Sequence, residues 1–463
     1  MPEQNHTQRD RWRVMISRRG ASEVIVLFDG TAFDLPEVRL PQNQRLAWNL
    51  NAALKNDWQL DVVSIAPSNV RSQSNVGDPV RYHLAELIQP NVPLPSGMRW
   101  ATVSSLTSQS FLVAADYNAL RAFHEGLSAS PGTHAPFEHL GWFREVTSWI
   151  EDAIIPFRLQ WNGRFEQFHA SASFSLIRFE TLPRAVWFKA VGEPNTREFA
   201  IIRELSKHCQ EYVPRLLAVR PDWNGWLAEE CPGKTLDQVS DIDLWRHAVR
   251  SLANLQVESL SWSKSLLLAG AHDLRTLFAR PAVERFFALV ERLVAPMAES
   301  VTPDFPVEDL RLMKGRMLQL LDHAGNSRVP EALGHLDLNA GNVVVSSGQC
   351  GYLDWAEAYV GPPFLALEYL LQNFRRAFGR GSQHESSVVQ TYLTVWEPLI
   401  PFSDIRDFWG LTPALAVFAY AQRCLLAAEP YGLGVSRFTN YLRALLRRLK
   451  NELAKCNGLE VGV

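Results

Sequence analysis

The sequence contains only five cysteines, and no two of them form a C-x-x-C pair. Scattered single cysteines neither chelate zinc nor shuttle disulfides, so we expect reduced thiols in a cytoplasmic protein. The polar N-terminus, MPEQNHTQRDRWR, lacks the apolar core of a secretory signal. The longest uncharged apolar run, from Leu411 to Ala421, falls well short of the ~20 residues that span a bilayer. These absences predict a protein that is neither secreted nor embedded in a membrane.

The chain also lacks a charge bias, because 46 Lys and Arg residues face 49 Asp and Glu residues, for a net charge of -3. A dedicated nucleic-acid binder would carry a strong positive excess, so we expect a small molecule or a protein as partner. No repeat or low-complexity segment is present. The hydrophobic fraction of 47% excludes disorder across the whole chain, and 463 residues suffice for about three domain-sized units. The 15 tryptophans favour core packing, with carbohydrate binding as the alternative.

Residues 1–132 are predicted to form a compact α+β module. Two short β-type runs, Trp12 to Ser17 and Glu23 to Phe28, flank a Gly-containing turn and predict a hairpin. The helix that follows, Asn43 to Asn56, has leucines at four-residue spacing, which places them on one face. Three more strands and a closing helix are expected at Leu60 to Ile65, Arg81 to Ile88, Arg99 to Val103, and Val113 to Leu127.

The order of these elements resembles a Nudix domain, with DLPEVRLP standing before the helix. Hydrolysis in that family depends on a helix with closely spaced glutamates, because these carboxylates hold Mg²⁺ on a pyrophosphate. The corresponding helix here, NQRLAWNLNAALKNDW, contains no glutamate. The resemblance is therefore one of layout, and a structural, docking or substrate-gating role is expected for this module in place of catalysis.

The rest of the chain divides into three parts. A linker helix is expected within residues 133–160. Residues 161–232 predict a small lobe of five strands and one helix, the latter at Thr196 to Cys209. Residues 233–463 are mostly helical, except for a strand-rich island from Leu333 to Leu353.

That island contains EALGHLDLNAGNVVVSSGQCGYLDWAEAYVGPPF. It includes an H-x-D-x-x-x-x-N motif, formed by His335, Asp337 and Asn342, and then an apolar strand, a turn and a second strand that ends at Asp354. Either motif alone arises readily by chance. Their joint occurrence at the separation of one tight hairpin is much more specific.

This pattern resembles the catalytic loop and metal-binding segment of the aminoglycoside phosphotransferase and choline kinase-like family. The resemblance covers residues 145 to 455. It implies an α+β, protein-kinase-like bilobal fold, with an antiparallel sheet N-lobe and a helical C-lobe, preceded here by the separate small α+β domain. It also implies ATP and Mg²⁺ as cofactors and a small-molecule acceptor.

The resemblance also implies roles for the motif residues. Asp337 would orient the acceptor hydroxyl and accept its proton as the catalytic base. Asn342 and Asp354 would hold Mg²⁺, a hard cation that prefers oxygen ligands. His335 would give structural support by bracing the loop.

An independent match lies upstream, at Lys189 in the apolar strand AVWFKAV. A lysine in such a strand is costly unless its stem reaches solvent or its ammonium is paired. By resemblance, Lys189 would contact the α and β phosphates of the nucleotide, which would lie between the lobes, and Glu198 would hold Lys189 in place. Glu204 is the alternative partner.

Two further segments would bind the nucleotide. GWLAEECPGKTL resembles the family's hinge, where backbone groups of Glu229, Glu230 and Cys231 would pair with the adenine edge. ASASFS takes the place of a glycine-rich loop. Ser171 and Ser173 in this turn would offer donors to phosphate, with a plain polar turn as the alternative.

The sequence departs from the family pattern at several positions. Leu336 stands where the family usually has Gly, and Asn339-Ala340 replaces the frequent His-Pro. Gln256 stands where His is frequent. Candidate walls of the acceptor pocket are taken from the C-terminal helices: Asp404, Asp407, Trp409 and Tyr420.

The sequence thus predicts an ATP- and Mg²⁺-dependent small-molecule kinase that phosphorylates a hydroxyl group. The alternative is a non-catalytic nucleotide-binding scaffold or regulatory pseudokinase. A protein kinase is disfavoured because the glycine-rich loop, D-F-G and A-P-E segments are absent.

Overall fold

The structure is a computed structural model that describes residues 9–18, 22–41, 45–72, 80–89, 91–127, 135–294, 305–428 and 436–456. The chain divides into two compact units. The first comprises Met1–Phe199 and Arg215–Glu230, and the second comprises Ala200–Pro214 and Cys231–Val463. Within the described ranges, none of the helices combines the length and apolarity needed to cross a membrane.

The first unit begins with a seven-stranded sheet whose main path runs β3-β2-β1-β6-β5, with β4 also pairing with β1 and β7 with β2. The expected hairpin of β1 and β2 is confirmed, and β1 additionally pairs in parallel with β6. The strands are β1 (Arg9–Ser17), β2 (Glu23–Phe28), β3 (Phe33–Asp34), β4 (Glu37–Pro41), β5 (Val62–Ser72), β6 (Val80–Leu87) and β7 (Met98–Thr102).

Two helices accompany this sheet, α1 (Leu46–Trp58) and α2 (Ala114–Leu127). Helix α1 buries Ala47, Leu50 and Leu54, as the four-residue leucine spacing predicts. Leu50 and Leu54 join a core formed by strand residues such as Val14 and Ile16.

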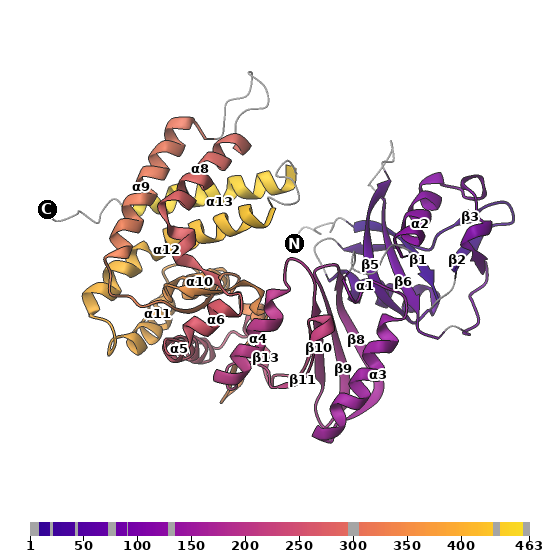
Figure 1. Ribbon diagram of the computed structural model, residues 1–463, viewed down its shortest axis with the longest axis horizontal. Helices are drawn as coiled ribbons and strands as arrows, with labels where there is room; N and C mark the ends of the chain where they lie inside the picture. Colours follow the sequence, from indigo (N-terminus) through magenta and orange to yellow (C-terminus); the bar gives the residue numbers. More distant parts are fainter. Residues whose placement is uncertain are drawn as a thin grey trace, which may run out of the picture. The chain divides into compact units, whose positions relative to one another are not determined.

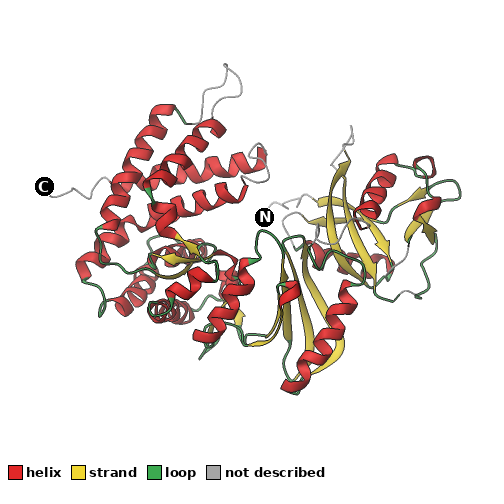
Figure 2. Cartoon of the chain, in the orientation of Figure 1, coloured by secondary structure: helices red, strands yellow, loops and turns green. Residues whose placement is uncertain are grey.

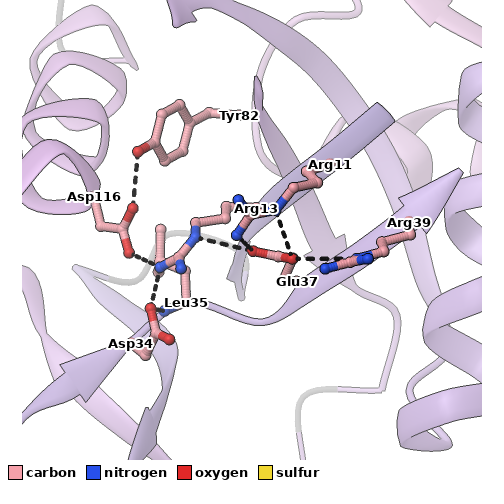
Figure 3. Close-up of polar contacts among 8 residues, drawn as sticks. All are labelled: Arg11, Arg13, Asp34, Leu35, Glu37, Arg39, Tyr82 and Asp116. Carbon is pink, nitrogen blue, oxygen red and sulfur yellow. Dashed lines mark hydrogen bonds and ion pairs between the residues drawn. The ribbon is translucent and has the colours of Figure 1, made fainter. Parts of the chain in front are cut away.

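A polar network lies within this module (Figure 3). The Arg13 guanidinium forms ion pairs with Asp34 and with Asp116, which is fully buried. The Tyr82 hydroxyl donates to the other Asp116 oxygen at 2.8 Å, and Glu37 accepts from Arg11 at 2.8 and 3.0 Å. Each carboxylate in the network already has a cationic partner. The network therefore stabilises the module internally and leaves no carboxylate unpaired for a ligand.

The second sheet of the first unit is antiparallel, with strand order β11-β12-β10-β9-β8. The strands are β8 (Gln160–Ser171), β9 (Phe174–Leu182), β10 (Val186–Val191), β11 (Leu216–Arg220) and β12 (Gly225–Glu229). Helix α3 (Trp142–Ile154) runs alongside β8 and β9 (Figure 1). It buries Trp142, Val146 and Ile150.

The two sheets of the first unit share one hydrophobic core. This cluster joins residues of the N-terminal module, including Met15 and Tyr82, to Trp142 of α3 and to Phe179 and Phe188 of the second sheet. The N-terminal module is therefore packed as part of the first unit, because apolar side chains of both sheets are buried against one another. The boundaries predicted at residues 132, 160 and 232 stay predictions.

The second unit is mostly helical (Figure 2). Its helices of five or more residues in the described ranges, apart from α4 (Arg197–His208), which begins in the first unit, are α5 (Ile242–Ser259), α6 (Ser263–Leu268), α7 (Leu274–Phe278), α8 (Arg280–Val294), α9 (Val307–Gly325), α10 (Phe364–Phe378), α11 (Gln383–Trp396), α12 (Phe402–Ala428) and α13 (Ser436–Lys455). Two small sheets accompany them. One has the order β13-β16-β17 and the other β14-β18-β15. Their strands are β13 (Lys234–Thr235), β14 (His272–Asp273), β15 (Ala332–His335), β16 (Val343–Val345), β17 (Cys350–Tyr352) and β18 (Ala358–Gly361).

The predicted fold class is confirmed. An antiparallel five-stranded sheet, with one helix between its strands β10 and β11 in the chain, precedes a helical region, and the strand-rich island lies where the motif pattern places it. Helix α10 was not singled out from the sequence. Its residues Phe364 to Leu371 are all buried, so its first two turns are covered on every side.

Candidate active site

Lys189 and Glu198 lie together in the first unit. Lys189 is on β10, and Glu198 is in the first turn of α4. The Lys189 Nζ lies 2.6 Å from the Glu198 Oε1, and the two side chains are 12% and 2% exposed. The alternative partner, Glu204, binds Lys207 and His208 of its own helix at 2.7 and 3.2 Å. The short connection from β10 to α4 thus places a buried, paired ammonium beside the sheet.

Ser171 is the last residue of β8 and Ser173 lies in the turn before β9, and their hydroxyl oxygens lie 2.9 Å apart. The Gly192 amide donates to the Ser173 carbonyl at 2.9 Å and so ties the turn to the end of β10. A Cβ atom on Gly192 would lie 2.2 Å from the Ala172 carbonyl oxygen, so this close approach requires glycine. The turn is therefore fixed by hydrogen bonds at both ends.

The predicted hinge begins at the end of β12. The Glu229 amide donates to the Arg215 carbonyl at 2.9 Å, and the Glu230 amide donates to the Ala185 carbonyl at 3.0 Å. The Glu230 carboxylate binds Arg178 at 2.6 and 3.0 Å. Since these two amides are already hydrogen-bonded, a backbone contact of Glu229 or Glu230 with a nucleotide base would use a carbonyl oxygen. Cys231, the third predicted hinge residue, begins the main segment of the second unit.

In the second unit, the catalytic-loop motif forms a hydrogen-bonded turn after β15. The buried His335 ring accepts from the Asp337 amide at Nδ1, at 3.1 Å, and its Nε2 lies 3.3 Å from the Leu353 carbonyl oxygen. The side-chain amides of Asn339 and Asn342 both donate to the Asp337 carbonyl, at 3.3 and 3.2 Å. The backbone of Asp337 is thus held from three sides.

The strands β16 and β17 bring Asn342 and Asp354 to the same end of one hairpin. Val343 pairs with Tyr352, and the Leu353 amide donates to the Asn342 carbonyl at 2.9 Å. The Asn342 side-chain nitrogen donates to the Asp337 carbonyl, so the predicted metal contact of Asn342 would use its side-chain oxygen. Asp354 has a positive φ of 63°, which is unusual for a residue with a side chain.

This donor set fits Mg²⁺. Within the described ranges, no three His, Cys, Asp or Glu side chains converge as metal ligands. Mg²⁺ does not need such a cage, because it is commonly held by one or two carboxylates together with substrate phosphates and water. One carboxylate and one amide oxygen at a hairpin end match that requirement.

The electrostatic environment of the loop favours neutral forms. Burial raises the pKa of Asp337, the Asp354 and Glu357 charges act in the same direction, and His335 opposes them. Burial also lowers the pKa of His335, so its ring is neutral at pH 7. A neutral ring that accepts at Nδ1 carries its proton on Nε2, so it donates to the Leu353 carbonyl. Its two hydrogen bonds to backbone are consistent with a bracing role.

Sequence reasoning missed a group of residues that support this loop. The Leu336 amide donates to the Glu357 carbonyl at 2.9 Å. The Glu357 carboxylate binds Arg423 of α12 at 2.8 and 2.9 Å and lies 3.3 Å from His272 of β14. Burial raises the pKa of Glu357, but His272 and Arg423 outweigh this effect, and the pKa of Glu357 is lowered. Arg423 is 66 residues from Glu357, so no local pattern could have linked them.

The departures from the family pattern have local explanations. Leu336 is 1% exposed, so its side chain is accommodated in the core, and its φ is not positive. The Asn339 carboxamide oxygen accepts from the Gly341 amide at 2.9 Å and so closes the turn itself. Gln256 is fully buried, and its side-chain amide donates to the Pro363 carbonyl at 3.0 Å.

The four candidate wall residues lie on α12 but not in one environment. Asp404 lies 3.8 Å from Arg328 and Asp407 lies 3.1 Å from Arg406. The Trp409 ring packs against Phe364, with centroids 6.3 Å apart. Burial raises the pKa of Tyr420, and the Asp337 charge contributes in the same direction. The Tyr420 hydroxyl also lies 3.2 Å from that of Tyr441. Of the four, Tyr420 has the clearest electrostatic link to Asp337.

Several solved structures are similar to this structure. A choline kinase, LicA, from Streptococcus pneumoniae is 15% identical, with 67% of this chain and 99% of that chain covered and a TM-score of 0.44. An ethanolamine kinase from Plasmodium vivax is 13% identical, with 73% and 94% covered and a TM-score of 0.48. Aminoglycoside 2'-phosphotransferase-IIIa in complex with GDP is 16% identical, with 67% and 98% covered and a TM-score of 0.44. No curated protein sequence is similar enough to this chain to be matched.

The family assignment comes from sequence, because all three TM-scores are below 0.5. Residues 183–399 match the phosphotransferase enzyme family. This segment is slightly under half of the chain, and it contains Lys189, the catalytic-loop motif and Asp354. None of these matches is to a Nudix protein, so the layout resemblance of residues 10–130 stays unconfirmed. Residues 183–399 thus match the phosphotransferase enzyme family, and this match confirms the resemblance predicted from their motifs.

Proposed function

We propose that the protein is a small-molecule kinase that transfers the γ-phosphate of ATP to a hydroxyl group. The observation that carries the proposal is the β16–β17 hairpin. It holds Asn342 and Asp354 at one end through the 2.9 Å bond between Leu353 and Asn342, while Asn342 also donates to the Asp337 carbonyl. A catalytic base and oxygen ligands for a cation are recurring parts of phosphoryl-transfer sites.

In the proposed reaction, Asp337 orients the acceptor hydroxyl and accepts its proton as the hydroxyl oxygen bonds to the γ-phosphorus. The bond from that phosphorus to the β–γ bridging oxygen breaks, and ADP leaves. Lys189, held by Glu198 at 2.6 Å, binds the α and β phosphates. Mg²⁺ bound by Asn342 and Asp354 would neutralise charge on the phosphate oxygens.

The acceptor is proposed to be a small molecule, in keeping with the family match of residues 183–399. The N-terminal module supplies no catalytic group in this proposal. Its charged network around Arg13 is internally balanced, and its helix α1 carries no glutamate. Its contribution is structural, through the core that it shares with the sheet of Lys189.

The test compares the full chain with Asp337→Asn in an ADP-release assay with ATP, Mg²⁺ and a panel of amino alcohols, sugars and aminoglycosides. We expect transfer to at least one acceptor by the natural chain and a loss of about 10²- to 10⁴-fold in Asp337→Asn, because a general base contributes about that much. ATP affinity, measured by calorimetry, should stay within about twofold, since Asp337 contacts the acceptor and not the nucleotide.

Asp322→Asn is the matched control, because Asp322 is exposed on α9 with 73% of its side chain accessible. This variant should retain full activity. ATP binding without transfer to any acceptor would favour the nucleotide-binding scaffold, and undiminished transfer by Asp337→Asn would contradict the role of Asp337.

A further inference from the structure

His169 is a polar residue near the C-terminal end of β8, and the sequence did not single it out. Its imidazole ring stacks on Phe174, with centroids 3.7 Å apart and an angle of 7° between the planes. Its Nε2 lies 2.8 Å from the Ser171 hydroxyl oxygen. The ring is therefore held in one orientation, with one nitrogen directed at the turn.

The hydroxyl groups of the turn form a chain. Ser171 Oγ lies 2.8 Å from His169 and 2.9 Å from Ser173 Oγ, and the Phe174 amide donates to the same Ser171 oxygen at 3.4 Å. A hydroxyl oxygen has two lone pairs and one proton. If His169 and Phe174 occupy both lone pairs, the Ser171 proton is directed to Ser173. The alternative acceptor, the Phe174 carbonyl, is more distant at 3.4 Å.

The direction of hydrogen-bond donation along these hydroxyl groups decides whether Ser173 presents a donor or an acceptor to a ligand. With the proton on His169 Nε2, donation runs from His169 to Ser171 to Ser173, and the Ser173 proton is left over as a donor. With the opposite polarity, Ser173 would present lone pairs. Among the described residues, the Ser173 hydroxyl makes no other hydrogen bond. A phosphate oxygen only accepts hydrogen bonds, so only the first polarity suits it.

The turn lies close to the proposed phosphate-binding lysine. Phe174, which stacks on His169, also lies under the Lys189 ammonium, 5.3 Å from it. Val191, two residues after Lys189, pairs with Phe174 in the sheet. One aromatic ring therefore contacts both the start of the hydroxyl chain and the ammonium group.

We propose that His169 is a positioning residue that polarises the Ser171–Ser173 hydroxyl chain, so that Ser173 donates a hydrogen bond to a phosphate group of the nucleotide. This inference rests on the proposed function, because it names a partner of that reaction's nucleotide. It assigns the turn a fixed direction of hydrogen-bond donation, from His169 to Ser173, which a turn without a ligand would not require. The protein would thereby replace the amide-lined glycine-rich loop with side-chain donors.

The experiment measures the affinity of the full chain for ATP with Mg²⁺, and separately for adenosine, which lacks phosphate. Ser173→Ala should weaken ATP binding about tenfold, because a hydrogen bond to a charged group is lost. His169→Phe keeps the stacking on Phe174 but removes the donor, and it should weaken ATP binding about fivefold. In both variants the affinity for adenosine should be unchanged.

Two further variants separate polarity from packing. His169→Gln places an amide donor near the position of Nε2 and should restore ATP affinity to within about twofold of the natural chain. Ser171→Ala interrupts the chain, so the double variant His169→Phe/Ser171→Ala should bind ATP no more weakly than Ser171→Ala alone. Thermal unfolding of each variant reports whether the unit is still folded.

The inference is overturned if His169→Phe binds ATP as the natural chain does, if ATP and adenosine affinities fall together, or if His169→Gln is as weak as His169→Phe. These outcomes leave the proposed function standing, since Asp337→Asn tests it independently. Absence of ATP binding by the natural chain would instead overturn the proposed function, and this inference with it.

Discussion

The side chain of Gln167 hydrogen-bonds both backbone groups of Ser64. Its Oε1 accepts from the Ser64 amide at 2.7 Å, and its Nε2 donates to the Ser64 carbonyl at 2.8 Å. Gln167 is on β8 and Ser64 is on β5, and each of these strands lies at one edge of its sheet. Asn51 of α1 completes the group by donating to the same Gln167 oxygen at 3.0 Å. One buried side chain thus caps an edge that would otherwise expose unpaired backbone groups.

Gln167→Leu should destabilise the first unit. The substitution leaves the Ser64 amide and carbonyl buried without partners, and each such group costs about 1 to 3 kcal/mol. We expect the free energy of unfolding, measured in urea by tryptophan fluorescence, to fall by about 2 to 4 kcal/mol. Gln160→Leu, at the exposed start of the same strand, should change it by less than about 0.5 kcal/mol. Equal effects of the two substitutions would contradict the role of Gln167.

Lys189→Met should reduce both stability and activity. It removes the ammonium that lies 2.6 Å from the Glu198 carboxylate, which is 2% exposed. Losing one partner of a buried pair costs about 3 to 5 kcal/mol, because the remaining charge stays desolvated. Adding Glu198→Gln removes that charge, so the double variant should recover part of the free energy of unfolding while ADP release stays low. A double variant no more stable than Lys189→Met would argue against a charge effect.

Leu336→Gly tests the departure from the family pattern. The Leu336 side chain is 1% exposed, and removing it creates a cavity next to the catalytic loop. We expect the free energy of unfolding to fall by about 3 to 5 kcal/mol, in the range for large core truncations, and we expect the rate of transfer to fall too. Leu336→Met, which conserves volume, should cost less than about 1.5 kcal/mol. Higher activity in the glycine variant would show that Leu336 hinders the loop.

His83 should make the first unit sensitive to acid. It is fully buried on β6, beside Trp12, and among the described residues neither ring nitrogen has a hydrogen-bond partner. Burial lowers the pKa of His83 to about 3. Between that value and about 6.5, the unfolded chain binds a proton that the folded chain excludes, so stability falls as the pH falls through this window.

His83→Leu should remove this dependence. Unfolding in urea at pH 7.5, 6 and 5 should show a smaller loss of free energy for this variant than for the natural chain, by up to about 1.4 kcal/mol per pH unit below pH 6.5. His124→Gln, at an exposed position on α2, serves as the control and should leave the slope unchanged. A slope identical in all three proteins would exclude His83 as the source.

The parts of the site that the sequence predicted are those formed by neighbouring segments. A hairpin of eleven residues brings Asn342 to Asp354, and one strand-to-helix connection brings Lys189 to Glu198. Both arrangements follow from the local connections of the chain, so the spacing of the motif residues is enough to predict them. The same holds for the five-stranded sheet, whose first three strands are consecutive in the chain.

The parts that the sequence did not predict depend on distant pairs. Gln167 and Ser64 are 103 residues apart, and Arg423 and Glu357 are 66 apart. A buried glutamine or arginine gives no periodic signal of its own, because its partner is chosen only when the chain is packed. His169 escaped notice for a related reason, since its stacking and hydrogen bond depend on where the folded β8–β9 turn places Phe174 and Ser171.

The first unit is discontinuous in the chain, since residues 200–214 belong to the second unit and 215–230 return to the first. Strand β12 is internal to its sheet, between β10 and β11. During synthesis from the N-terminus, β10 therefore has no neighbour on that side until residues 225–229 have left the ribosome. The exposed strand edge would persist through the translation of α4, and a ribosome stalled before residue 225 would hold an incomplete sheet open to aggregation.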